Sequence, residues 1–156
     1  MLDKTDLKIL QILQENGQIS NQALADQVAL SPSPCLRRVK QLVEAGYIIH
    51  HVALLDPKKL NLNLMIFVLV GLNNHSQSIM EGFKKDIQRI PEVIQCHVIT
   101  GQSADYLLKV AVPELSHYRD FCLHKLLAIK GVASVQSSFV LESIIDKTAL
   151  PLDHLN

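Results

Sequence analysis

The sequence lacks the cysteine and histidine patterns that hold disulfide frameworks and metal ions. Its three cysteines, Cys35, Cys96 and Cys122, are odd in number and widely spaced, and none lies in a CxxC pair. This usage argues against structural disulfides and fits a reducing compartment. Two of the seven histidines, His50 and His51, are adjacent, and the cysteines and histidines form no set with zinc-finger spacing. We therefore expect neither a metal nor a cofactor.

A membrane-spanning run and an excess of positive charge are also missing. The longest apolar run, residues 64–72, is far shorter than the roughly 20 residues of a membrane helix. Residues 1–6 lack the basic start and apolar core of a secretion signal. The 15 lysines and arginines balance 15 acidic residues, which counts against a non-specific polyanion binder but leaves room for a local basic patch. We expect a cytoplasmic protein with no membrane partner.

The first third of the chain carries the signals of three short helices. Asp3 or Thr5 is expected to cap a first helix that runs to about Glu15. A second helix is expected over about 22–28, and a turn at 29–32 leads into the third. Two short helices joined by such a turn form a helix-turn-helix, whose second helix enters the major groove of DNA.

The third helix is expected to begin where Ser33 offers a capping oxygen and Pro34 fits the first turn, and to end at Gly46. Apolar residues recur along it at helical spacing, so one face packs while the other is free for recognition. A solvated basic face is the alternative. For Arg38, phosphate contact or simple solvation is favoured over a base-edge contact. The candidate DNA-binding residues here are Ser31, Ser33, Arg37, Arg38, Lys40 and Gln41.

Residues 47–55 are rich in strand formers and end at Asp56–Pro57. We expect a small wing of two short strands, with His50 at or near its tip. The tip of a winged helix can lie on the DNA backbone, so His50 joins the candidate DNA-binding residues. An exposed turn that contacts nothing explains the same pattern.

From residue 64 the pattern changes to strand–helix–strand units. Strands are expected at 64–72, 93–100, 106–112 and 132–141, with helices after the first and third. The order βαββαβ is that of the ferredoxin-like sandwich, an α+β fold in which two helices cover one face of the sheet. The open face carries Ile66, Val68 and Val70 or their neighbours and invites dimerisation. Residues 143–147 are expected to add an edge strand.

A second candidate site lies in the loop of residues 100–106. Gly101 permits backbone conformations closed to other residues, so neighbouring N–H groups can converge on a carboxylate. Asp105 can accept from an ammonium group, and the Tyr106 ring can wall a pocket. Together these groups complement an amino-acid zwitterion. An ordinary hairpin loop, with glycine at the turn and aspartate as a local cap, explains the same spacing.

Motifs along nearly the whole chain resemble those of the Lrp/AsnC family, also called feast/famine regulators. They are Leu2-Asp3-x-x-Asp6, Leu30-Ser31-Pro32-Ser33-Pro34-Cys35-Leu36-Arg37-Arg38-Val39, Thr100-Gly101-x-x-x-Asp105-Tyr106 and Ser138-Phe139-Val140-Leu141. The resemblance implies an N-terminal winged helix-turn-helix and a C-terminal ligand-sensing βαββαβ domain. We place the DNA-binding domain at 1–55, a linker at 56–63, and the effector-binding and oligomerisation domain at 64–156.

The resemblance also implies that the 100–106 loop binds a free amino acid between neighbouring dimers, and that this binding changes assembly or DNA binding. Aliphatic neighbours such as Leu72 and Val98 favour leucine or methionine. Homodimers, often four in a ring to make an octamer, would bind a pseudo-palindromic operator in double-stranded DNA. The candidate effector-binding residues are Thr100, Gly101, Asp105, Tyr106 and, on the fourth strand, Ser137.

Two other classes of function remain to be weighed. An enzyme is disfavoured, because the sequence shows no nucleophile–base pair, no paired carboxylates and no metal set. An amino-acid-binding assembly protein, whose N-terminal domain contacts protein rather than DNA, is the alternative because the net charge is zero. Binding to promoter DNA that weakens steeply with salt would favour the transcriptional regulator.

Overall fold

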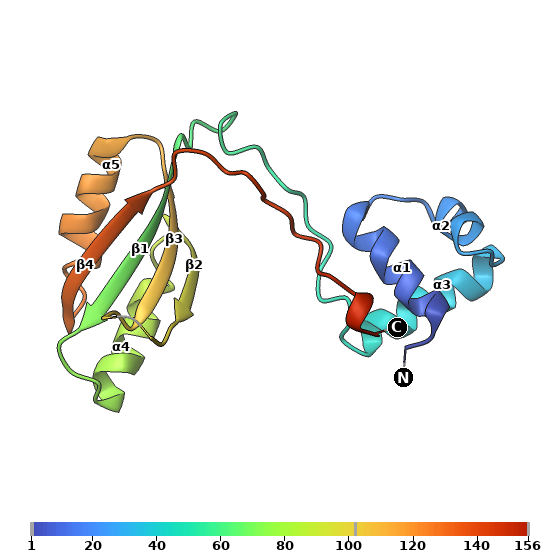
Figure 1. The fold of residues 1–156 in the computed structure, drawn as a ribbon, viewed down its shortest axis with the longest axis horizontal. Helices are drawn as coiled ribbons and strands as arrows, with labels where there is room; N and C mark the ends of the chain where they lie inside the picture. Colours follow the sequence, from blue (N-terminus) through green and yellow to red (C-terminus); the bar gives the residue numbers. More distant parts are fainter. Residues whose placement is uncertain (1, 102, 156) are drawn as a thin grey trace. The chain divides into compact units, whose positions relative to one another are not determined.

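The computed structural model describes residues 2–101 and 103–155 and divides the chain into two compact units (Figure 1). One unit consists of Met1–Leu54 together with Ile144–Asn156, and the other of Leu55–Ser143. The C-terminal segment therefore groups with the N-terminal helices, whereas the sequence placed it in the second domain. In the described part of the chain, no helix is long and apolar enough to cross a membrane.

Three helices build the N-terminal unit: α1 (Lys4–Glu15), α2 (Asn21–Gln27) and α3 (Pro32–Glu44). A capping box begins α1, since the carboxylates of Asp3 and Asp6 each accept the backbone N–H of the other residue. Ser20 caps α2 by accepting from the Ala23 N–H at 3.2 Å. The buried core between the helices consists of Ile9, Leu24, Ala25, Val28, Cys35 and Leu42.

Helix α3 begins two residues earlier than the sequence predicted. Its N-cap is Ser31, so Pro32 and Pro34 both lie in the first turn. The first turn of a helix leaves its backbone N–H groups without helical partners, and a proline there loses no hydrogen bond. The Ser33–Pro34 pair therefore indicated the right turn of the chain but not the first residue of the helix.

The same left-handed cap closes α2 and α3. Gly46 ends α3 at φ +77°, as predicted, and Ala29 ends α2 at φ +56°. The Leu30 N–H donates to the Ala25 carbonyl at 2.9 Å, and Tyr47 closes α3 in the same way. Glycine adopts this conformation freely, but it costs an alanine about 1–2 kcal/mol. The turn between the two helices therefore holds strain that its hydrogen bonds and packing offset.

We expect Ala29→Gly to stabilise the N-terminal unit by about 0.5–1 kcal/mol. Glycine removes the left-handed strain, and part of that gain is lost to its greater freedom in the unfolded chain. Urea unfolding measures the change. Gly46→Ala is the matched control and should destabilise the unit by about 1 kcal/mol. An Ala29→Gly variant less stable than the parent would contradict the strain account.

The strands expected at 47–55 and 143–147 are not formed. Residues 48–56 pair with no strand, and Ile49, Val52 and Leu54 are each more than 70% exposed. Residues 143–147 also form no strand. Strand-forming residues need a hydrogen-bonded neighbour, and an isolated two-stranded hairpin is marginal in water. These residues have the propensity for strands but no partner.

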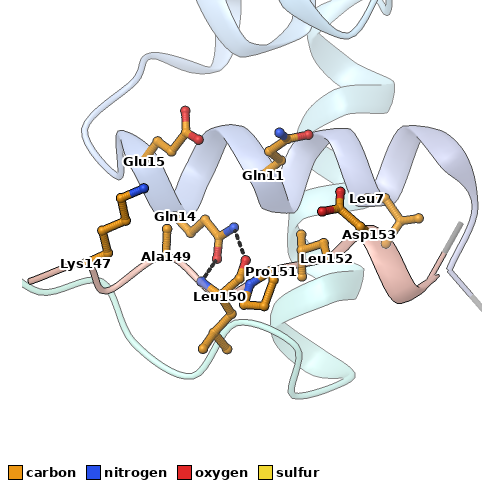
Figure 2. A pocket seen from close by; sticks show the side chains of 10 residues that line it. All are labelled: Leu7, Gln11, Gln14, Glu15, Lys147, Ala149, Leu150, Pro151, Leu152 and Asp153. Carbon is orange, nitrogen blue, oxygen red and sulfur yellow. Dashed lines mark hydrogen bonds between the residues drawn. The ribbon is translucent and has the colours of Figure 1, made fainter. Parts of the chain in front are cut away.

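The C-terminal segment packs on α1 instead (Figure 2). The Gln14 Nε2 donates to the Leu150 carbonyl at 2.9 Å, and the Leu150 N–H donates to Gln14 Oε1 at 2.9 Å. One side-chain amide thus pairs with the backbone as a neighbouring strand would. A cavity of about 360 Å³ lies beside this contact, lined by α1 and residues 147–153.

The second unit is a four-stranded antiparallel sheet with helices on one face (Figure 1). The strand order is β2-β3-β1-β4, which confirms the predicted βαββαβ, α+β class. The helices are α4 (Gln77–Ile87) and α5 (Leu115–Asp120), which continues as a π-helix (Phe121–Leu126). The strands are β1 (Leu64–Leu72), β2 (Val93–Val98), β3 (Tyr106–Val112) and β4 (Val132–Phe139).

The other face of this sheet carries a row of apolar side chains along β1, with Lys109 of β3 opposite its centre. Ile66, Val68 and Val70 of β1 are fully buried under the helices, so the open face carries their neighbours. Phe67, at the middle of β1, is 39% exposed there. The side chains that share the open face along β1 and its partner β3 are Met65, Phe67, Leu69, Leu107, Lys109 and Ala111.

Candidate DNA-binding helix and ligand loop

The outer face of α3 carries most of the candidate DNA-binding side chains. Cys35 and Leu42 of the same helix are buried in the core. Successive residues of a helix are about 100° apart, so the exposed positions lie on the side opposite this buried pair. Cationic and hydrogen-bonding groups on one exposed face suit contacts with phosphates and base edges. These exposed residues are Ser33, Arg37, Lys40 and Gln41.

Arg38 lies on a different side of α3 and contacts α1. Its Nη1 is 2.7 Å from Asp3 Oδ2 and 2.7 Å from Asp6 Oδ1, and its side chain is 30% exposed. Asp6 and Asp3 raise the pKa of Arg38. The Asp6 N–H, and then Arg38, lower the pKa of the Asp3 carboxyl. The sequence suggested DNA contact or solvation for Arg38, but in the structure its guanidinium joins α3 to the start of α1.

Ser31 and His50 lie outside the α3 face. Ser31 is the exposed N-cap of α3, and its side chain makes no capping hydrogen bond. Its hydroxyl is therefore available at the start of the helix, where a phosphate would be favoured. His50 is exposed in the extended segment after α3, beside a cavity of about 670 Å³ at the end of α1.

In the second unit, Asp105 is fixed by several hydrogen bonds just before β3. Its N–H donates to the Val70 carbonyl at 2.9 Å, and its own carbonyl accepts from the Ile99 N–H at 3.0 Å. Its Oδ2 accepts from the Leu72 N–H at 2.7 Å, and its Oδ1 lies 2.6 Å from His75 Nε2. The Leu72 N–H, with His75 assisting, holds the pKa of the Asp105 carboxyl below its usual range. The carboxylate is therefore negatively charged at neutral pH.

A β-bulge lies beside the Leu72 N–H, on the β4 side of β1. The pairing of β1 with β4 shifts register between Gly71 and Leu72, which takes Leu72 out of the regular ladder. A Cβ on Gly71 would lie 2.5 Å from Ser134 Oγ and 3.5 Å from the Ser103 carbonyl oxygen. The absence of a side chain at Gly71 thus lets β4 and the 100–106 loop approach the end of β1 together.

The other candidate ligand residues are divided between the loop and the core. Thr100 and Gly101 are exposed in the loop, and Gly101 has the predicted left-handed conformation at φ +87°. Tyr106 is only 1% exposed and packs on Phe83 of α4, with ring centroids 4.3 Å apart. Its ring therefore belongs to the core. Among the described residues, its buried hydroxyl has no hydrogen-bond partner.

Ser137 does not point into the loop site, so this expectation is corrected. It pairs with Val68 in the middle of β1, and its hydroxyl hydrogen-bonds to that of Tyr118 in α5. The serine of β4 opposite Gly71 is Ser134. Sequence reasoning missed both Ser134 and His75. Ser134 lies opposite Gly71 through the register of β1 with β4, and His75 lies in a short turn with no periodic signal.

Two family models match the chain, one at each unit. A model described as a winged helix-turn-helix DNA-binding domain matches residues 2–49, and the Lrp/AsnC ligand binding domain matches residues 65–150. The chain belongs to the Lrp/AsnC family. This regulator therefore pairs a DNA-binding domain with a ligand-binding domain, which favours DNA over protein as the partner of the N-terminal unit.

Known relatives agree with this assignment. The leucine-responsive regulatory proteins of Klebsiella pneumoniae and Escherichia coli K12 are each 40% identical over 143 residues, 92% of this chain and 87% of theirs. A transcriptional regulator from Neisseria meningitidis, solved as its L-Met complex, is 46% identical with a TM-score of 0.97 and full coverage of both chains. An AsnC family regulator from Agrobacterium tumefaciens is 37% identical with a TM-score of 0.93, covering 99% of this chain and 100% of its own.

We expect Arg37→Ala to impair DNA binding and Arg38→Ala to impair stability. Arg37 is exposed, so its loss should weaken binding and reduce the slope of log affinity against log salt by about one for each bound subunit. Arg38→Ala should lower the melting temperature, because it leaves Asp3 and Asp6 without their cation. Fluorescence anisotropy with a duplex selected from a random pool, and thermal melting, measure the two effects. If Arg38→Ala kept the melting temperature of the parent but lost DNA binding, Arg38 would be a DNA contact and not a structural residue.

Proposed function

We propose that this regulator controls transcription by binding methionine or leucine at the loop of residues 100–106. The observation that carries the proposal is the Asp105 carboxylate, which the Leu72 N–H fixes at 2.7 Å and which is still 27% exposed. A fixed, charged carboxylate at a loop is a ready partner for the ammonium group of an amino acid. Exposed Thr100 and Gly101 offer backbone N–H groups of the same loop for its carboxylate.

The choice of methionine or leucine rests on the relatives and on local chemistry. The Neisseria regulator was solved with L-Met, and the K. pneumoniae and E. coli relatives are called leucine-responsive. Both amino acids carry an uncharged aliphatic or thioether side chain. The exposed Val98, at the end of β2, gives such a side chain an apolar surface near the loop.

Assembly is the proposed link between ligand and DNA. The open face of the sheet exposes Phe67 between Met65 and Leu69, with Lys109 opposite it on β3, and it suits a two-fold contact between copies. Dimers of this kind, with four dimers forming an octamer, would present paired α3 helices to a pseudo-palindromic operator. The proposed DNA contacts come from Arg37, Lys40 and Gln41, with Ser31 and Ser33 toward phosphate.

We expect Asp105→Ala to abolish methionine binding while it leaves assembly intact. The substitution removes the partner of the ammonium group without touching the open face of the sheet. Calorimetric titration with the twenty amino acids, with light scattering in parallel, measures both properties. Asp120→Ala, on exposed α5, is the matched control and should bind like the parent. Equal methionine affinity in the Asp105→Ala and Asp120→Ala variants would mean that this loop is an ordinary hairpin and not the ligand site.

We expect Phe67→Glu to convert dimers to monomers. A carboxylate at position 67 replaces the largest apolar side chain of the open face and would have to be desolvated in the interface, even with Lys109 opposite it. Sedimentation velocity measures the mass. Leu123→Glu is the matched control, since Leu123 is 53% exposed on the helix side of the sheet and lies outside the open face. An unchanged mass for Phe67→Glu would exclude this face as the dimer interface.

A further inference from the structure

The two oxygens of the Asp105 carboxylate have partners of different kinds. Oδ2 accepts from the Leu72 N–H, a main-chain donor fixed at the end of β1. Oδ1 is 2.6 Å from Nε2 of His75, whose side chain is 64% exposed. The first partner is part of the sheet, whereas the second is a surface side chain on the short turn between β1 and α4. Only the second can leave without disturbing the sheet.

His75 occupies the position that a ligand ammonium group needs. An imidazole N–H and an ammonium N–H are both donors that a carboxylate oxygen accepts, so a ring placed on Oδ1 obstructs an ammonium group that approaches the same oxygen. In the part of the chain that the structure describes, His75 is the one side chain that hydrogen-bonds to this carboxylate. Surface pairs of this kind contribute only about 0.2–1 kcal/mol. Such a contact is strong enough to shift ligand affinity and weak enough to be displaced.

We propose that His75 competes with the effector for Asp105 and so sets the effector concentration to which this regulator responds. The proposal rests on the proposed function of the 100–106 loop. In the free protein His75 covers Oδ1, and in the complex the ammonium group of the amino acid replaces it. His75 is therefore a residue that tunes affinity without contributing to the bound state.

Calorimetric titration of this protein with L-methionine tests the competition, because the two substitutions at His75 should change the affinity in opposite directions. His75→Ala removes the competitor and should tighten binding by about two- to five-fold. His75→Lys places a permanent cation beside Asp105 and should weaken binding. His124→Ala, an exposed histidine on the π-helix that follows α5, is the control and should match the parent.

A merely structural His75 would give a different pattern. Both substitutions would then weaken binding, because each would loosen the turn before α4, and that result would overturn the proposal. Unchanged affinity in His75→Ala, with binding lost in Asp105→Ala, would overturn the competition but leave the ligand site standing. A parent protein that binds none of the twenty amino acids would overturn both.

Discussion

The hydrogen bond from the Leu72 N–H to the Asp105 carboxylate is the constraint on which the ligand half of this protein depends. It joins the end of β1 to the residue before β3, next to Gly71, where a side chain would meet Ser134 of β4. A carboxylate held by a main-chain donor is preorganised, so little has to rearrange when a cation arrives. The same bond lowers the pKa of the Asp105 carboxyl.

Charge has a structural role in the N-terminal unit as well. Arg38 links α3 to the capping box of α1, which leaves Arg37 and Lys40 as the cations on the outer face of α3. A helix with two such cations makes few phosphate contacts, and affinity for DNA rises steeply when linked copies bind together. Under the proposed dimerisation, assembly therefore governs DNA binding, and a ligand that alters assembly alters transcription.

The sequence predicted the order of helices and strands of the two units, the α+β class and the cap at Gly46, and it offered Asp3 as one of two caps for α1, because these signals are local. It did not decide which side chains of β1 point toward the helices, since a continuous apolar run does not show which alternate residues are buried. It misplaced Ser137, because the face on which a strand residue lies depends on the register of the whole sheet. The sequence also did not predict that residues 47–55 form no strand, or that Arg38 pairs with Asp3 and Asp6. Both outcomes depend on which groups lie nearby in space.

A crystal structure of this protein grown with L-methionine is the most direct test of the central claim. The account predicts the ammonium nitrogen within hydrogen-bonding distance of Asp105 Oδ1, the Leu72 N–H still on Oδ2, and His75 turned away. Methionine bound at another place, or bound with His75 still on Asp105, would contradict it.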